Sequence, residues 1–200
     1  MSELITTTPQ SADHSVQLEI VKFNELTSVM NNQQIRLATV AIADFVNRQE
    51  ADDKQMLSVT PEAIAERHTA VIALEPPQPT STEPSLATAS TEGDGVANFA
   101  SRLVGYVGAM TPIEHTCAGT TRQMTEVGSL KVSRRLRGHG IGTVLFGKIL
   151  QATEEEGLTP YAFCNADSLP IAESLAGREI TYATEVPPEA LELCKTCPLY

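Results

Sequence analysis

The sequence has no run that approaches the roughly 20 apolar residues needed to span a bilayer. Its first residues, MSELITTTPQSADH, lack the basic and apolar regions of a secretory signal. We therefore expect a soluble, cytoplasmic protein without a membrane partner. Basic residues are also scarce, with 14 Lys and Arg against 25 Asp and Glu and a formal net charge of −11. This balance argues against nonspecific binding to nucleic acid, which requires a basic face.

Cysteines are too few and too scattered for a disulfide scaffold, because the chain has only four. Only Cys194 and Cys197 have a chemically suggestive spacing, C-x-x-C. A structural zinc site would need two more ligands, and no second pair supplies them. A redox pair normally begins a helix after a strand, whereas this one lies three residues from the C-terminus. Two free thiols are therefore the simplest interpretation of this pair, with zinc binding or redox chemistry as the alternative. We predict no metal site.

Hydrophobic periodicity predicts a single α/β (α+β) domain over residues 15–186. Its order is strand, two helices, two strands, then strand, helix, strand, helix and strand, which is not a regular βαβ repeat. We therefore expect a mixed, mostly antiparallel sheet flanked by helices. The predicted strands cover residues 15–23, 69–74, 102–110, 124–132, 161–165 and 179–186, and the predicted helices cover residues 28–48, 61–68, 141–156 and 170–176.

Three segments have little to bury. Residues 1–14 are polar and are predicted to form a flexible N-terminal tail, and residues 187–200 a C-terminal tail. Residues 76–96 are rich in proline, serine and threonine and are predicted to be disordered. Since residues 102–110 look like the hairpin partner of residues 69–74, this segment is interpreted as an insertion in one sheet and not as a linker between domains.

A turn with three alternating glycines, Gly138, Gly140 and Gly142, joins the strand that ends at Val132 to an amphipathic helix. Glycines let the backbone approach a ligand and turn N–H groups toward it, and a helix N-terminus adds partial positive charge. Residues 127–153 contain no acidic residue but hold five of the chain's basic residues. The pattern predicts an anion site, most simply for phosphate.

Two common phosphate motifs do not fit this turn. A P-loop requires Gly-Lys followed by Ser or Thr, which is missing here. A dinucleotide fingerprint would begin at Gly138, but Thr143 stands at its third glycine position, and the next strand lacks the acidic residue. A glycine-rich turn without a ligand remains the alternative.

The sequence from Val132 to Gly142 resembles V-x-P-x-x-R-G-x-G-I-G, the pyrophosphate loop of the GNAT N-acetyltransferase superfamily, with Arg134 at the proline position. The resemblance implies that acetyl-CoA binds here as acyl donor. It also implies that Asn165-Ala-Asp-Ser168 matches the family's N-x-x-[AS] turn, which contacts the pantetheine arm. The residues expected to bind acetyl-CoA are Leu130, Val132, Arg137, Gly138, His139, Gly140, Ile141, Gly142, Thr143, Asn165 and Ser168.

The sequence identifies the residues for acid and base catalysis less clearly than the acetyl-CoA contacts. Glu126 is the best candidate for the base that takes the amine proton, although a solvated glutamate at a strand end is the simpler explanation for this residue. Strict alternation would put Glu126, Gly128, Leu130 and Val132 on one face of the strand. Ala172 stands where the family has the tyrosine that protonates the leaving thiolate, so Tyr161, Tyr182 or water is left for that role.

The resemblance implies direct acetyl transfer from acetyl-CoA to a primary amine, on a small molecule or a protein. A catalytically inactive acyl-CoA-binding sensor or interaction module is the alternative, because the tyrosine is missing. The sequence allows a homodimer but identifies no acceptor.

Overall fold

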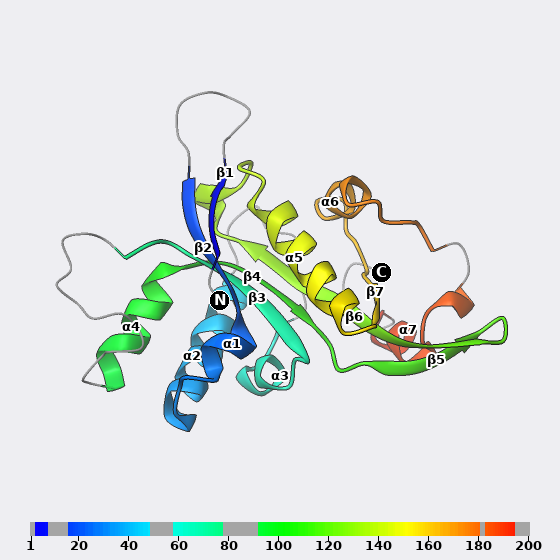
Figure 1. Ribbon diagram of the computed structural model, residues 1–200, viewed down its shortest axis with the longest axis horizontal. Coiled ribbons are helices and arrows are strands. Elements are labelled where there is room, and N and C mark those ends of the chain that lie inside the picture. Colours follow the sequence, from blue (N-terminus) through cyan, green and yellow to red (C-terminus); the bar gives the residue numbers. More distant parts are fainter. Residues whose placement is uncertain (1–2, 8–15, 49–57, 78–91, 181–182, 195–200) are drawn as a thin grey trace.

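The computed structural model describes residues 3–7, 16–48, 58–77, 92–180 and 183–194, and it is organised around one sheet (Figure 1). In the described residues the sheet has seven strands in the order β1-β2-β3-β4-β6-β5, with β7 beside β6. Of the pairs between these described strands, β6–β7 alone is parallel. A mixed, mostly antiparallel sheet is thus confirmed. The strands are β1 (Glu3–Thr7), β2 (Val16–Lys22), β3 (Thr69–Leu74), β4 (Leu103–Ala109), β5 (Ile113–Cys117), β6 (Thr120–Val132) and β7 (Thr159–Tyr161).

Helices cover both faces of this sheet (Figure 1). We call the face that packs against α2 the α2 face, and the opposite face, which packs against α5, the α5 face. In the described residues, no helix is long and apolar enough to cross a membrane. The helices are α1 (Phe23–Thr27), α2 (Asn32–Asn47), α3 (Pro61–Ala65), α4 (Glu92–Arg102), α5 (Ile141–Glu155), α6 (Leu169–Ser174) and α7 (Pro188–Cys194).

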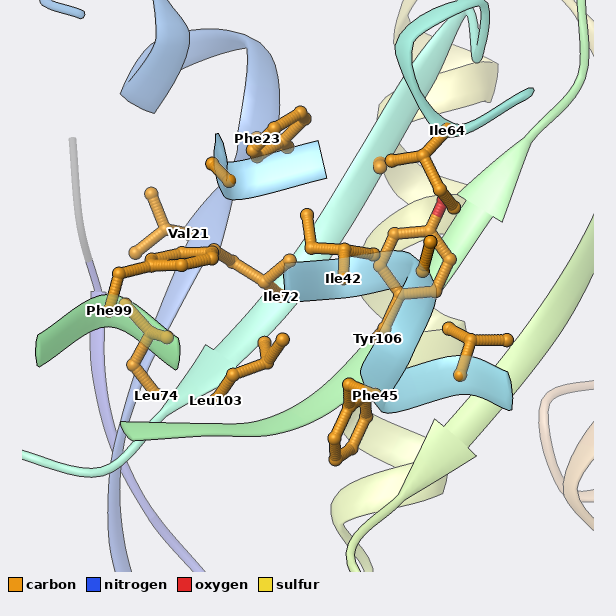
Figure 2. Close-up of a cluster of buried hydrophobic side chains, with 14 residues drawn as sticks. Val21, Phe23, Ile42, Phe45, Ile64, Ile72, Leu74, Phe99, Leu103 and Tyr106 are labelled. Atoms are coloured by element: carbon orange, nitrogen blue, oxygen red, sulfur yellow. The ribbon is translucent and has the colours of Figure 1, made fainter. Parts of the chain in front are cut away.

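The α2 face is covered by a cluster of buried hydrophobic side chains, which Figure 2 shows in close-up. Ile42 from α2, Ile72 from β3 and Tyr106 from β4 are each fully buried in it. Phe99 from α4 is 0% exposed in the same cluster, so α4 is fixed to the domain core. Local signals fix the helix starts: Asn31 and Gln34 form a capping box at α2, as expected for these residues.

The α5 face is packed by the predicted helical stripe of α5. Ile141, Leu145 and Ile149 are each at most 1% exposed, against Val71 and Val107 of the sheet. Residues at such helical spacing bury one side of the helix, and this burial fixes where its N-terminus lies. The beginning of α5 is therefore held rigidly at the end of β6.

Two predictions about the chain ends differ from the structure. Within the predicted tail 1–14, Glu3–Thr7 forms β1 and pairs antiparallel with β2, from Glu3 opposite Ile20 to Thr7 opposite Val16. Within 187–200, Pro188–Cys194 forms α7, and Ala190 is 3% exposed in a small cluster with Tyr161. Both segments are short, so neither has enough periodicity to be recognised before its packing partner is known.

Two internal predictions also need correction. Residues 92–96 of the predicted insertion 76–96 begin helix α4, while residues 78–91 lie outside the described residues. The alternating segment 179–186 is not a strand where it is described, because Ala183–Glu185 forms a 3₁₀ turn. Alternation alone does not make a strand, because strand formation also depends on tertiary context.

Candidate active site

The glycine turn is folded against the sheet before α5 begins. After β6, Arg134–Leu136 forms a single 3₁₀ turn, whose Leu136 is 8% exposed in the core of the α5 face. The Ser133 N–H donates to the Val104 carbonyl oxygen at 2.8 Å. Gly138 and Gly140 have φ of 78° and 75°, the left-handed region that favours glycine. A Cβ at either position would meet open space, so the backbone angle, and not crowding, requires glycine there.

The turn presents a row of unused N–H groups. In the described residues, the backbone N–H groups of residues 138–143 have no hydrogen-bond acceptor, whereas the Val144 N–H donates to the Gly140 carbonyl at 3.1 Å. We call residues 138–143 the amide cradle. The Arg137 N–H lies outside it because this group donates to the Arg134 carbonyl at 3.1 Å. Consecutive free N–H groups at the start of a helix can bind an anion such as a pyrophosphate.

Two polar side chains of the turn interact with the turn itself. Arg137 donates through Nε to the Val132 carbonyl oxygen at 3.2 Å, and His139 Nδ1 lies 2.9 Å from the Arg137 carbonyl oxygen. Both contacts stabilise the path of the backbone. The Val132 carbonyl oxygen therefore already accepts a hydrogen bond from the Arg137 side chain.

Gly142 has a different reason to be glycine. A Cβ there would lie 3.1 Å from Cδ1 of Ile171 in α6, which is tighter than an ordinary contact. Its absence lets α6 pack closely against the first turn of α5. The amide cradle and the segment after β7 are brought together in this way, although they are far apart in sequence.

The segment after β7 is a tight polar turn. Asn165 Oδ1 accepts hydrogen bonds from the N–H groups of Asp167 and Ser168, at 2.9 and 3.0 Å. Ser168 Oγ in turn accepts from the Asn165 N–H at 3.0 Å, so it braces the turn and does not cap α6 with its own side chain. In the described part of the chain, the Asn165 Nδ2 group has no acceptor. It remains a donor that a ligand carbonyl could use.

β6 and β7 pair only at their beginnings. The register runs from Met124 opposite Thr159 to Glu126 opposite Tyr161, and no further pair follows in the described residues. The other edge of β6 pairs with β4 as far as Val132. The edge of β6 that faces β7 therefore has no strand partner over residues 127–132, including the predicted contacts Leu130 and Val132. An extended ligand can bind along such an edge.

A β-bulge interrupts β6 in this stretch. Ser129 has φ of 59°, and the pairing with β4 shifts between Tyr106 and Gly108. An extra residue in one strand reverses the alternation of side chains beyond it. Leu130 and Val132 pack on the α5 face, whereas Lys131 reaches the Arg48 carbonyl on the α2 face. The prediction that Glu126 shares a face with Leu130 and Val132 is wrong for this reason.

Glu126 lies on the α2 face, since its neighbour Val127 packs on the α5 face. Its carboxyl is half-buried, and burial raises its pKa from 4.5, an effect that the Arg67 guanidinium partly offsets. Tyr106 is 0% exposed, and burial raises its pKa to about 12. In the described residues, its hydroxyl has no hydrogen-bond partner.

Sequence reasoning missed Arg67 and Tyr106, which complete this polar group around Glu126. No motif links the three residues, because they come from the α3–β3 turn, from β4 and from β6. Ala172 lies in α6, as the spacing indicated, and supplies no acid. Tyr161 is the register partner of Glu126 in β7, while Tyr182 lies outside the described residues.

Comparison with known families settles the relationship. The family model described as acetyltransferase (GNAT) family matches residues 64–177, which include the amide cradle, Glu126 and Asn165. The chain belongs to the GNAT acetyltransferase family. Among curated protein sequences, no match to this chain was found.

Solved structures agree with this membership at the level of the fold. Glucosamine-6-phosphate N-acetyltransferase from Arabidopsis thaliana is 10% identical, with a TM-score of 0.50, 82% of this chain covered and 94% of that one. An acetyltransferase from Trypanosoma brucei is 15% identical, with a TM-score of 0.51 and coverage of 85% and 99%. The expected GNAT resemblance is thus confirmed.

Proposed function

We propose that this protein is an N-acetyltransferase that transfers an acetyl group from acetyl-CoA to a primary amine. The observation that carries the proposal is the amide cradle at the end of a strand edge that has no partner. An anion site followed by a free edge suits a ligand that has a pyrophosphate at one end and an extended amide chain at the other.

The residues of the chain then have distinct roles. The amide cradle binds the pyrophosphate, while the Asn165 Nδ2 group and the open edge of β6 hold the pantetheine arm. Acetyl-CoA supplies an activated acyl group as a thioester. Glu126, on the α2 face, accepts the proton of the amine, directly or through a water, so that the neutral amine can attack. Positioning of the two reactants and backbone N–H groups near the carbonyl provide most of the acceleration.

Protonation of the leaving thiolate falls to a group other than Ala172. Tyr161 is the best-placed side chain, since it stands opposite Glu126 in the β6–β7 pair. Water is the alternative donor. The acceptor is a small-molecule or protein amine; glucosamine 6-phosphate, named for the Arabidopsis relative, is a reasonable first compound to test.

The test of this proposal compares Gly140→Val with Gly119→Val. Both glycines have φ near 75–78° and open space around a Cβ, but Gly119 lies in the β5–β6 turn, away from the cradle. We expect calorimetry to show acetyl-CoA binding to the wild type and to Gly119→Val, and a loss of at least tenfold in Gly140→Val. Equal affinity in the two variants would refute the cradle as the binding site.

Assays with amino sugars, polyamines and peptides as acceptors then distinguish an N-acetyltransferase from a catalytically inactive acyl-CoA-binding module. Release of CoA that depends on an acceptor supports the enzyme. Tight acetyl-CoA binding without turnover on any amine would instead support the acyl-CoA-binding module.

A further inference from the structure

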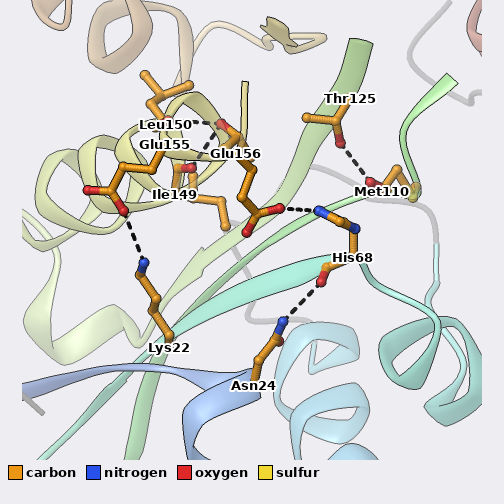
Figure 3. A network of polar contacts seen from close by, with 10 residues as sticks. Lys22, Asn24, His68, Met110, Thr125, Ile149, Leu150, Glu155 and Glu156 are labelled. Atoms are coloured by element: carbon orange, nitrogen blue, oxygen red, sulfur yellow. Dashed lines mark hydrogen bonds and ion pairs between the residues drawn. The ribbon is translucent and has the colours of Figure 1, made fainter. Parts of the chain in front are cut away.

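Arg67 directly precedes His68, whose contacts with Asn24 and Glu156 are shown in Figure 3. Both residues lie in the turn that follows α3 and leads into β3. His68 donates its N–H to the Ala109 carbonyl at 3.0 Å and accepts from Asn24 Nδ2 at 3.0 Å. The His68 ring contacts the Glu156 carboxylate at the end of α5. The Cα of Arg67 is therefore fixed relative to β4 and α5 before its side chain makes any contact.

The Arg67 side chain crosses from β4 to the bulge of β6. Its Nη1 contacts the sulfur of Met110, and its Nη2 donates to Ser129 Oγ at 3.2 Å. A Cβ added to Gly108 would lie 3.4 Å from Arg67 Cδ and 2.5 Å from the Tyr106 hydroxyl oxygen. The glycine thus leaves room for both side chains over β4, and the guanidinium reaches the bulge because of it.

Ser129 needs such a contact. Its φ of 59° is a left-handed conformation, which is unfavourable for a residue other than glycine. The bulge sets which side chains of β6 lie on each face, and it lies within the open edge proposed for the pantetheine arm. A hydrogen bond to the Ser129 side chain therefore acts on the geometry of both sides of the strand.

The charge of Arg67 is not neutralised by contact. In the described residues, no carboxylate lies within ion-pair distance of its guanidinium, and its buried Nε has no hydrogen-bond partner. Both hydrogen-bonding partners of the side chain are neutral. The titratable groups around Glu126 are Arg67 from the α3–β3 turn, Tyr106 from β4 and, by register, Tyr161 from β7. Of these, Arg67 is the one that is cationic at neutral pH.

Gly108, beneath Arg67, pairs with Gly128 of β6, and a Cβ added to Gly128 would lie 3.5 Å from Glu126 Oε1, so the two side chains lie over neighbouring strands. We propose that Arg67 is a positioning residue for acetyl transfer: it holds the bulge at Ser129 and places its positive charge on the side of β6 that carries the Glu126 carboxylate. This inference rests on the proposed function, because it assumes that Glu126 accepts the proton of the amine. The Arg67 guanidinium thereby connects the open edge of β6, which is proposed to bind acetyl-CoA, with the α2 face, where Glu126 is proposed to meet the amine.

The test replaces Arg67 in the full-length chain and follows Glu126 directly. Titration of the Glu126 side-chain carboxyl by carbon NMR is compared in wild type, Arg67→Met and Arg67→Lys. Arg122→Met is the matched control, because Arg122 is an exposed arginine of β6, the strand that carries Glu126. We expect the Glu126 midpoint to rise by about one pH unit or more in Arg67→Met, as is usual when an opposite charge is lost nearby. Arg67→Lys and Arg122→Met should stay close to the wild type.

The acidic limb of the pH–rate profile should move by the same amount as the NMR midpoint, which a purely structural role would not produce. An unchanged midpoint in Arg67→Met would overturn the inference. Should Arg67→Met fail to fold, Arg67→Gln makes the same comparison, since it keeps an amide donor for Ser129 but loses the charge. Absence of turnover in the wild type would refute the proposed function, and the NMR titration would still show whether Arg67 controls Glu126.

Discussion

Replacement of Glu126 by glutamine separates catalysis from stability. Glutamine has nearly the same shape as glutamate but cannot accept a proton at neutral pH. We expect turnover with a suitable acceptor to fall by roughly 10²-fold or more, the usual effect of losing a general base. That loss corresponds to about 2.7 kcal/mol in the activation free energy. Acetyl-CoA affinity should be unchanged, because the Glu126 side chain lies on the α2 face and is not among the residues proposed to bind acetyl-CoA.

The same substitution should stabilise the fold at neutral pH. Burial raises the pKa of Glu126 in the folded state above its usual 4.5, so the folded state binds this proton more tightly than the unfolded state does. The contribution to stability is complete below the unfolded value and is lost as pH rises through the raised folded value. Glu126→Gln removes this loss, and its melting temperature should exceed that of the wild type at pH 7. The difference should shrink as the pH falls.

The assays are a pH–rate profile and thermal unfolding at several pH values. Glu114→Gln is a matched control, since Glu114 is an exposed carboxylate on the neighbouring β5. The control should keep its activity. Turnover close to wild type in Glu126→Gln, with the acidic limb still present, would show that water or another residue takes the proton. An activity loss together with lower stability at pH 7 would point to misfolding instead.

Two further substitutions test the parts of the site and the core separately. Asn165→Asp keeps the Oδ1 acceptor that binds the Asp167 and Ser168 N–H groups but loses the Nδ2 donor. Acetyl-CoA affinity measured by calorimetry should therefore fall, while the melting temperature should change little. Equal affinity in the variant and the wild type would show that Asn165 does not contact the pantetheine arm. Phe99→Ala should cost about 3–5 kcal/mol in the free energy of unfolding by urea, because Phe99 is 0% exposed in the core of the α2 face; a loss below 1 kcal/mol would mean that α4 does not belong to the core.

Local patterns predicted the elements that carry the proposed cofactor site. The stripe of Ile141, Leu145 and Ile149 located α5, and the buried run TAVIAL matches β3 at Thr69–Leu74. The glycine spacing indicated where the amide cradle lies, and its role in binding acetyl-CoA stays a prediction. Among the described residues, the Arg137 N–H, which was expected to bind the pyrophosphate, is instead bonded to the Arg134 carbonyl. These signals depend on neighbours in sequence, so the sequence contains them in full.

The acceptor side could not be predicted in the same way. Arg67 and Ser129 are 62 residues apart in sequence and meet because β3, which follows Arg67, pairs with β4, and β4 pairs with β6. A regular alternation rule also fails at β6, because nothing in the residues TEVGSL requires Ser129 to adopt a left-handed conformation. The bulge arises from pairing with β4, a tertiary effect that overrides local preference.

The bulge allows the proposed amine side and the proposed cofactor side to share one strand. In a regular strand, Glu126 would point to the same face as Leu130 and Val132, and the proposed base would lie under α5 with the apolar core. With one extra residue at Ser129, the apolar side chains turn to the α5 face, while Glu126 stays among Arg67 and Tyr106 on the α2 face. A carboxylate can thus lie beside the open edge of β6 without facing the helix that supplies the amide cradle. Removing the bulge would therefore disturb the acceptor side and the cofactor side together, whereas removing Glu126 should affect the acceptor side alone.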